Sequence, residues 1–211
     1  MEAVVFDCDG LLLETESRWT MAEERVCQAH SVAFSMDLKR QMLGSSIERA
    51  GELLAAWVGL DRNHGPQMGK ELLAAYRHVV DENGVEPMPG VVELLTALHR
   101  RVPLAVASNT HEAETRRVIA AAKLPDVFEA VICAGGAIPP KPAPDLYLTA
   151  CAVMGAEPSQ SVAFEDSPLG AAAATAAGMF VIGVPSTVGV TLSTHRVLTS
   201  LREITATDLI G

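Results

Sequence analysis

The sequence predicts an α/β protein whose core is a doubly wound parallel sheet, with a helical bundle inserted after the first strand. From about residue 89 onward, helical segments alternate with short apolar segments, which is typical of a parallel sheet covered by helices on both faces. Between about residues 14 and 86 no strand-like alternation occurs, although a crossover between parallel strands needs only one helix. We therefore predict an α/β core of residues 1–14 and 87–211 and a helical cap domain of residues 15–86.

The first strand ends in two acids. An apolar run at residues 3–6 has the composition of a strand that is buried on both faces. Asp7, Asp9 and Gly10 follow it and would lie at the carboxyl end of the strand, where open α/β sheets bind their ligands. Asp-x-Asp-Gly is also an ordinary strand exit in which these residues serve backbone geometry. On these residues alone, both interpretations stay open.

The insertion contains three segments that favour helices. One periodic segment covers residues 16–30, and another covers about residues 66–82 before an Asn-Gly pair. Between them, residues 45–48 read Ser-Ser-Ile-Glu, which has the form of a capping box that begins at Ser45. Because the insertion leaves and re-enters near the end of the first strand, we expect it to lie over that end.

The other elements of the core follow a Pro-Gly turn at residues 89–90. We expect strands over residues 104–107, 130–133, 162–164 and 180–184. We expect helices over residues 91–101, 112–122, 145–154 and 169–177. The tail beyond residue 187 has the weakest pattern, and we predict one short helix there, between residues 194 and 201.

Composition limits the class of partner. Hydrophobic residues make up 49% of the 211 residues and charged residues 20%, which is ordinary for a globular protein. The net charge of −10 argues against nucleic acid or a membrane surface as a partner, since both are anionic. The four cysteines form no Cys-x-x-Cys pair, so neither a zinc site nor a disulfide framework is indicated. A strand that begins near residue 3 leaves no room for a secretory signal peptide. We expect a cytoplasmic protein that is a monomer or a weak dimer.

Polar side chains also follow three later strands. Ser108 and Asn109 follow the second strand, Lys141 follows the third across a loop, and Glu165 and Asp166 follow the fourth. Because the carboxyl ends of parallel strands meet at one edge of a sheet, we expect these side chains to gather near the two acids of the first strand. Clustered carboxylates without histidine or cysteine suit Mg²⁺. These are the parts of a phosphoryl-transfer site.

Each of these residues taken alone has a structural explanation. Ser108 could cap a helix, and Lys141 could be a solvated loop lysine. Glu165 or Asp166 could cap the helix that begins near residue 168. These explanations do not predict that all of them stand at successive strand ends in this order.

The four ordered motifs resemble those of the haloacid dehalogenase-like (HAD) hydrolases, in the phosphatase and β-phosphoglucomutase-like branch with a helical cap after the first strand. The resemblance covers nearly the whole chain and implies a Rossmann-like core. It also implies that Asp7 is the nucleophile that becomes an aspartyl phosphate. Asp9 would be the general acid that protonates the leaving oxygen and then the general base.

The resemblance implies the other site residues as well. Ser108 and Asn109 would hold the phosphoryl oxygens together with backbone N–H groups of the loop around Gly10, and Lys141 would neutralise charge between the phosphate and Asp7. The implied ligands of a Mg²⁺ cofactor are Asp7, the carbonyl oxygen of Asp9, and Asp166, with Glu165 assisting.

Residues of the cap carry weaker signals. Ser45 lies in a turn that resembles the substrate-specificity loop of the family, and Arg77 falls where the family often places a basic substrate contact. A capping box and an exposed helix arginine explain these two residues equally well. Trp19 stands where the sugar-phosphate mutases of this branch carry a histidine that gates the return of phosphate. Outside the cap, His111 is expected in the first turn of an exposed helix rather than in catalysis.

The predicted function is that of a Mg²⁺-dependent phosphatase whose substrate is a small phosphorylated metabolite such as a sugar or polyol phosphate. A sugar phosphomutase is the alternative within the family, and Trp19 argues against it. A non-catalytic sensor of phosphorylated ligands would be expected to lack one of the acids, and none is missing. A dehalogenase is disfavoured, because that reaction needs neither Asp9 nor the metal-binding acids.

Overall fold

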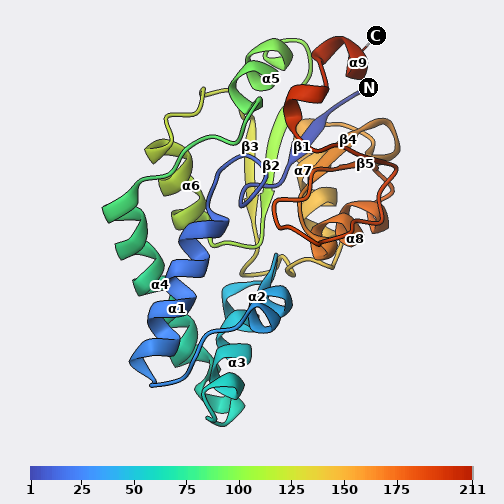
Figure 1. Ribbon diagram of the computed structural model, residues 1–211. Helices are drawn as coiled ribbons and strands as arrows, with labels where there is room; N and C mark the ends of the chain where they lie inside the picture. Colours follow the sequence, from blue (N-terminus) through green and yellow to red (C-terminus); the bar gives the residue numbers. More distant parts are fainter. Residues whose placement is uncertain (211) are drawn as a thin grey trace.

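In the computed structural model, which describes residues 1–210, the core is a six-stranded parallel sheet with the strand order β3-β2-β1-β4-β5-β6 (Figure 1). The strands are β1 (Val4–Phe6), β2 (Leu104–Ser108), β3 (Ala130–Cys133), β4 (Val162–Glu165), β5 (Phe180–Gly183) and β6 (Arg196–Val197). The prediction of a doubly wound α/β sheet is confirmed.

Strand β1 lies at the centre of the sheet. Val4 pairs with Leu104 of β2 on one side and with Val162 of β4 on the other. The chain adds β2 and β3 on the first side and then crosses over to β4, so the strand order changes direction between β1 and β4. In doubly wound sheets this switch point leaves a crevice outside the carboxyl ends of the strands. The residues that follow β1, β2 and β4 are therefore brought to one place.

Helices cover both faces of the sheet. Helices α5 (Val91–Leu98), α6 (Glu112–Ala121) and α9 (Ala206–Ile210) share a core with Val4 and Phe6. On the opposite face, α7 (Asp145–Met154) and α8 (Pro168–Ala176) share a core with Val5 and several alanines. Alternate residues of β1 point to opposite faces, and all three are fully buried. The first strand is thus fixed by packing from both sides.

The insertion folds into four helices, α1 (Glu16–Ala29), α2 (Met36–Met42), α3 (Ile47–Trp57) and α4 (Gly65–Asn83). Figure 1 shows them as a lobe at the end of the molecule opposite the two termini. Helices α3 and α4 cross closely, since a Cβ atom on Gly51 would lie 2.7 Å from the backbone nitrogen of Gly69. None of these helices, nor any other in residues 1–210, is long and apolar enough to cross a membrane.

Two antiparallel segments connect the helical lobe to the sheet. The backbone N–H of Glu14 donates to the carbonyl oxygen of Glu86 at 2.9 Å, and the N–H of Met88 donates to that of Leu12 at 2.9 Å. The chain therefore enters and leaves the lobe side by side, next to the end of β1. This places the lobe over the carboxyl ends of the central strands.

The capping box predicted at Ser45 does not form. The N-cap of α3 is Ser46, whose side chain accepts a hydrogen bond from the backbone N–H of Arg49. The N–H of Ser45 instead donates to the carbonyl oxygen of Met42, so Ser45 still belongs to the turn that ends α2. The helix begins one residue later than predicted, and the Ser45 hydroxyl is free for another role.

Two larger differences from the prediction lie in the core. The helix predicted over residues 91–101 ends at Leu98, because Arg100 takes a left-handed backbone conformation with φ of 63°. The helix predicted between residues 194 and 201 is replaced by β6, in which Arg196 pairs with Ile182 of β5. That edge pairing satisfies backbone groups that a helix would have satisfied internally. A short helix does occur in the tail, but later, at Ala206–Ile210.

Candidate active site

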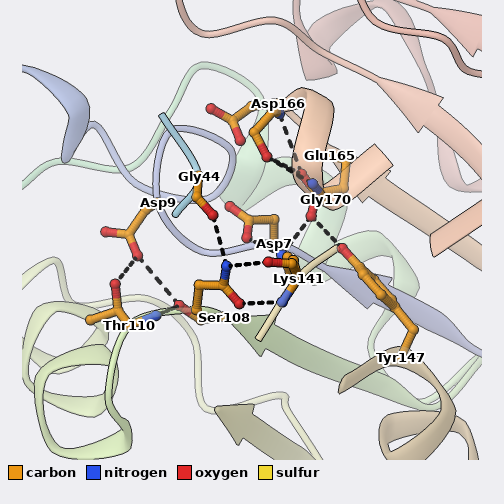
Figure 2. A network of polar contacts seen from close by, with 12 residues as sticks. Asp7, Asp9, Gly44, Ser108, Thr110, Lys141, Tyr147, Glu165, Asp166 and Gly170 are labelled. Carbon is orange, nitrogen blue, oxygen red and sulfur yellow. Dashed lines mark hydrogen bonds and ion pairs between the residues drawn. The ribbon is translucent and has the colours of Figure 1, made fainter. Parts of the chain in front are cut away.

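One buried cation lies between two buried carboxylates at the centre of the site. The Nζ atom of Lys141 donates to Oδ1 of Asp7 at 2.5 Å and to Oε1 of Glu165 at 2.5 Å. The hydroxyl of Tyr147 on α7 also donates to Oε1 of Glu165. All four side chains are buried, and Figure 2 shows them in one continuous network. These hydrogen bonds fix the Lys141 ammonium against the carboxylate of Asp7.

The charges of this network are unbalanced. Burial works to lower the pKa of the Lys141 ammonium, but the carboxylates of Asp7 and Glu165 outweigh it and hold that pKa well above its usual range. Burial, reinforced by the charges of Asp7 and Glu165, raises the pKa of Asp166 well above its usual range. Asp166 has no cationic partner within residues 1–210, and Ser186 donates to it at 2.5 Å. Three carboxylates therefore face a single ammonium group.

This donor set fits a divalent cation. Asp7, Glu165 and Asp166 each offer an oxygen, and these three oxygens lie within 4.8 Å of one another. A hard cation such as Mg²⁺ binds one or two carboxylates and completes its shell with waters or phosphate oxygens. A charge of +2 would offset the excess of two negative charges and relieve the unpaired Asp166. The side chain of Asp9 lies outside this group.

Asp9 points away from Asp7, into a set of hydrogen-bond donors. Its Oδ1 accepts from Oγ1 of Thr15 at 2.8 Å and from Nε1 of Trp19 at 3.1 Å. Its Oδ2 accepts from Oγ1 of Thr110 at 2.9 Å and from Oγ of Ser108 at 3.4 Å. The first two donors come from the insertion, whereas Ser108 ends β2 and Thr110 follows it, as Figure 2 shows for the latter pair. Asp9 thus connects the helical lobe to the sheet.

Asn109 also joins the two parts of the molecule. Its Nδ2 donates to the carbonyl oxygen of Gly44 at 2.8 Å, and its Oδ1 accepts from the backbone N–H of Lys141 at 2.7 Å. A Cβ atom on Gly44 would lie 2.6 Å from Oγ of Ser167, so the turn after α2 rests directly on the loop after β4. Because both ends of the Asn109 amide are occupied, its contacts position the backbone of Lys141 and the Gly44 turn.

Gly10 allows the acids to approach one another. Its φ of 82° lies in the left-handed region, and a Cβ atom there would collide with the carboxylate of Asp166. Glycine alone adopts this conformation without strain and leaves this space. The glycine that follows the two aspartates in the sequence is therefore required for the placement of Asp166.

A cavity of about 670 Å³, counting the space at its open mouth, lies between the lobe and the sheet. The sheet side of its lining includes Asp7, Asp9, Ser108, Asn109, Thr110, His111, Asp166 and Ser167. The lobe side includes Glu16, Trp19, Glu23, Lys39, Leu43, Gly44, Ser45 and Leu72.

The lobe side of the cavity has its own ion cluster. The Nζ atom of Lys39 lies 2.8 Å from Oε2 of Glu16 and 3.3 Å from Oε1 of Glu23. Burial raises the pKa of Glu23 to about 7, although the attraction of Lys39 opposes this shift and the charges of Glu16 and Glu24 add to it. Burial works to lower the pKa of Lys39, but Glu16 and Glu23 outweigh it.

A family model described as haloacid dehalogenase-like hydrolase matches residues 4–184. The chain belongs to this family. Hexitol phosphatase B of Escherichia coli O157:H7 is 32% identical over 225 residues, covering 99% of this chain and 96% of that protein. Validoxylamine A 7'-phosphate phosphatase of Streptomyces hygroscopicus subsp. limoneus is 30% identical over 187 residues, covering 88% of this chain and 86% of that protein.

The comparison with solved structures shows the same fold. The crystal structure of a beta-phosphoglucomutase from Clostridium difficile superposes with a TM-score of 0.86 at 20% identity, covering 100% of this chain and 96% of the other. The predictions of this family, its fold and enzymatic activity are confirmed. Haloacid dehalogenase-like enzymes generally use a divalent metal, and the acidic cluster fits this requirement.

The structure brings most of the predicted site residues together, but not all. Those that meet at the carboxyl ends of the strands are Asp7, Asp9, Gly10, Ser108, Asn109, Lys141, Glu165 and Asp166. Ser45 lines the lobe side of the cavity. Arg77 does not line the cavity, because its guanidinium pairs with Glu114 of α6 at 2.5 Å. His111 precedes α6 and lies 3.2 Å from Glu48.

Sequence reasoning missed several residues of this haloacid dehalogenase-like site. Thr15 and Thr110 donate to the carboxylate of Asp9, and Tyr147 donates to that of Glu165. Lys39 and Glu23 belong to the ion cluster of the lobe. Thr110 could have been found, because it follows Ser108 and Asn109 at a strand end. Tyr147 and Glu23 lie within helical segments, where the sequence gives no signal that separates a cavity-lining residue from an ordinary one.

Proposed function

We propose that the protein is a Mg²⁺-dependent phosphatase that hydrolyses small phosphorylated metabolites, sugar or polyol phosphates among them. The observation that carries this proposal is the buried Lys141 ammonium between Asp7 and Glu165. Asp7 lines the cavity together with Asp166, which has no cationic partner within residues 1–210. A cation and a metal-binding cluster that flank one carboxylate suit an attack on a phosphoryl group. The names of the two curated relatives, which are both phosphatases, support the same reaction.

The proposed reaction has two steps. A carboxylate oxygen of Asp7 attacks phosphorus, and the bond from phosphorus to the ester oxygen breaks, while the proton of the Asp9 carboxyl passes to the leaving oxygen. Water then attacks the phosphorus of the aspartyl phosphate, gives its proton to Asp9, and releases phosphate and the free Asp7 carboxylate. Lys141 offsets the negative charge that accumulates beside Asp7, and the hydroxyl of Ser108 binds a phosphoryl oxygen.

The proposed Mg²⁺ ligands are Asp7, Asp166 and the carbonyl oxygen of Asp9. When bound, the ion neutralises charge on the phosphoryl oxygens and on the carboxylates that hold it. We assign Glu165 to holding Lys141 in place, since its Oε1 accepts from both Lys141 and Tyr147. Asn109 likewise acts as a positioning residue for Lys141.

We infer that residues 15–86 act as a cap that opens to admit substrate. Gly44 of the lobe accepts from Asn109 and rests on Ser167, so substrate entry has to break these contacts. The paired segments at residues 12–14 and 86–88 are the place where such a hinge would act. Closure excludes water other than the attacking molecule and brings the lobe residues to the leaving group.

Removal of the metal tests the proposed function. We expect the purified enzyme to release phosphate from an aryl phosphate, chelation with EDTA to abolish this release, and excess Mg²⁺ to restore it. A panel of phosphorylated sugars and polyols, assayed for phosphate release, then identifies the substrate class. Full activity in EDTA would refute the role of the metal. A phosphate-shifted product without net release of phosphate would show a mutase instead.

Replacing Trp19 with phenylalanine is expected to lower kcat by about fivefold. The Trp19 ring stacks on Tyr76 with centroids 3.6 Å apart, and phenylalanine keeps much of that packing but loses the N–H that donates to Asp9. One hydrogen bond of about 1 kcal/mol corresponds to this factor. Trp57→Phe is the matched control, because it removes a Trp N–H bond to Ala33 elsewhere in the lobe. Equal kinetics of the two variants in an aryl phosphate assay would contradict a role of Trp19 in holding Asp9.

A further inference from the structure

The lobe end of the cavity contains polar atoms that the proposed hydrolysis does not use. Lys39 of α2 is 4% exposed and binds Glu16 and Glu23 of α1, and all three line the same cavity as Asp7. None of the three contacts the phosphate-binding residues through a hydrogen bond. The cavity therefore has two polar ends, one at the sheet and one at the lobe.

Two polar atoms at the lobe end of the cavity have neither a hydrogen bond nor an ion pair within residues 1–210. Oε2 of Glu23 and Oγ of Ser45 are buried and form no hydrogen bond with any group in residues 1–210. Glu23 is only 4% exposed, and burial of a polar atom without a partner is unfavourable in the folded protein. Both residues line the cavity, so a ligand that enters it can supply the missing hydrogen bonds.

A purely structural role explains only part of this cluster. The pair of Lys39 and Glu16 would be enough to connect α1 to α2. A second carboxylate, Glu23, gives the buried group a net charge of −1 when both acids are ionised, and excess buried charge opposes folding. An acceptor with a free oxygen and a serine hydroxyl that line one cavity are instead suited to hydroxyl groups of a ligand.

The sign of this charge restricts the ligand. The two carboxylates outnumber the one ammonium group, and Lys39 already contacts both of them. A second phosphate or a carboxylate on the ligand would therefore meet repulsion and find no free cation here. A neutral hydroxyl can donate to Oε2 of Glu23 and accept from Ser45.

We propose that Glu23, held by Lys39, and Ser45 form a subsite for the uncharged, hydroxyl-bearing end of the substrate, opposite its phosphate. The enzyme accordingly selects singly phosphorylated polyols and sugars and rejects substrates with a second anionic group at the far end. This inference rests on the proposed phosphatase function and adds the substrate class to it. It also separates the protein from enzymes whose substrates are bisphosphates.

A matched pair of substrates tests this subsite. Sorbitol 6-phosphate and 6-phosphogluconate share the same carbon chain and phosphate, but the far end is a hydroxyl in the first and a carboxylate in the second. At pH 8, where Glu23 is ionised, we expect the wild type to favour sorbitol 6-phosphate at least tenfold in kcat/KM. In Glu23→Gln this preference should fall at least fivefold, mainly through a higher KM for sorbitol 6-phosphate.

Controls separate this inference from the function on which it rests. Glu24→Gln removes the same charge from an exposed neighbour on α1 and should keep the wild-type preference. If Glu23→Gln does not fold, Ser45→Ala should raise the KM for sorbitol 6-phosphate about threefold more than that for 6-phosphogluconate.

A wild type that hydrolyses p-nitrophenyl phosphate but shows no preference within the pair, or turns over neither member, overturns the subsite. An unchanged preference in the variant that carries the test, whether Glu23→Gln or Ser45→Ala, overturns it as well. A wild type that fails on p-nitrophenyl phosphate overturns the phosphatase function instead.

Discussion

The Asp7→Asn variant is expected to release phosphate at a rate at least roughly 10⁴-fold below that of the wild type, because an amide is a very poor nucleophile compared with a carboxylate. Phosphate released from p-nitrophenyl phosphate in the presence of Mg²⁺ measures this loss. The fold should survive, since the substitution is nearly isosteric and Lys141 keeps its bond to Glu165. It also removes one of the three buried negative charges, which lessens the repulsion on Asp166.

The control for this variant is Asp37→Asn, because Asp37 is an acid with a highly exposed side chain on α2. It alters the net charge of the protein equally and should keep full turnover. The free energy of unfolding, measured in urea, should lie within about 1 kcal/mol of the wild-type value for both variants. Near-native turnover by a well-folded Asp7→Asn protein would mean that another group attacks phosphorus.

The residues at the strand ends could be predicted because the signals that place them are local. Three residues of apolar sequence define β1, and the acids must then follow at its carboxyl end. Parallel pairing of β1 with β2 and β4 brings Ser108 and Glu165 alongside without any information about side-chain packing. The order of motifs along the chain was therefore enough to predict this half of the site.

The lobe half of the site could not be predicted in the same way. Glu23 lies on an amphipathic helix where a glutamate usually faces solvent, and its burial depends on how α1 meets α2 and the sheet. The predicted substrate contact at Arg77 had the same difficulty, since the arginine turns toward Glu114 on α6. Side-chain direction on a packed helix depends on partners that are distant in the sequence, whereas strand ends depend on the strand itself.

Similar reasoning explains the shift of the helix cap from Ser45 to Ser46. Two consecutive serines both satisfy the local requirement for an N-cap, and the sequence gives no strong reason to choose between them. The choice depends on the end of α2, where the N–H of Ser45 is bound to Met42. Ser45, which does not cap the helix, lines the cavity instead. The shift of the cap by one residue therefore changes the expected role of Ser45 from structural to functional.

Replacing Lys141 with methionine should have the largest effect on both stability and activity. The substitution removes the one ammonium group that contacts Asp7 and Glu165 and leaves their carboxylates buried without a cation. Breaking a buried ion pair in this way typically destabilises a protein by about 3–5 kcal/mol. Urea unfolding at pH 8 in EDTA, where no bound metal adds stability, measures the loss. Phosphate release should fall below detection.

The pH dependence of this loss identifies its cause. Burial raises the pKa of the Asp7 carboxyl well above its usual range, and the charge of Lys141 opposes this shift. Without Lys141 the pKa of Asp7 rises further above its value in the unfolded chain, so the folded state binds more protons than the unfolded state. Stability that depends on such groups is present at low pH and is lost as the pH rises through their folded pKa values. The difference in stability between the wild type and Lys141→Met should therefore be smaller at pH 5 than at pH 8.

A double variant separates charge from chemistry. Lys141→Met with Glu165→Gln leaves Asp7 and Asp166 as the buried charges, which restores the net charge of −2 that the wild-type cluster carries. We expect it to recover roughly half of the lost stability, because the repulsion is relieved although the packing around Tyr147 is altered. It should stay inactive, because no ammonium group is left beside Asp7. If the double variant recovered activity together with stability, Lys141 would serve only to neutralise Glu165. If the unfolding midpoint of Lys141→Met alone were the same as that of the wild type, the lysine would not balance the charge of this cluster.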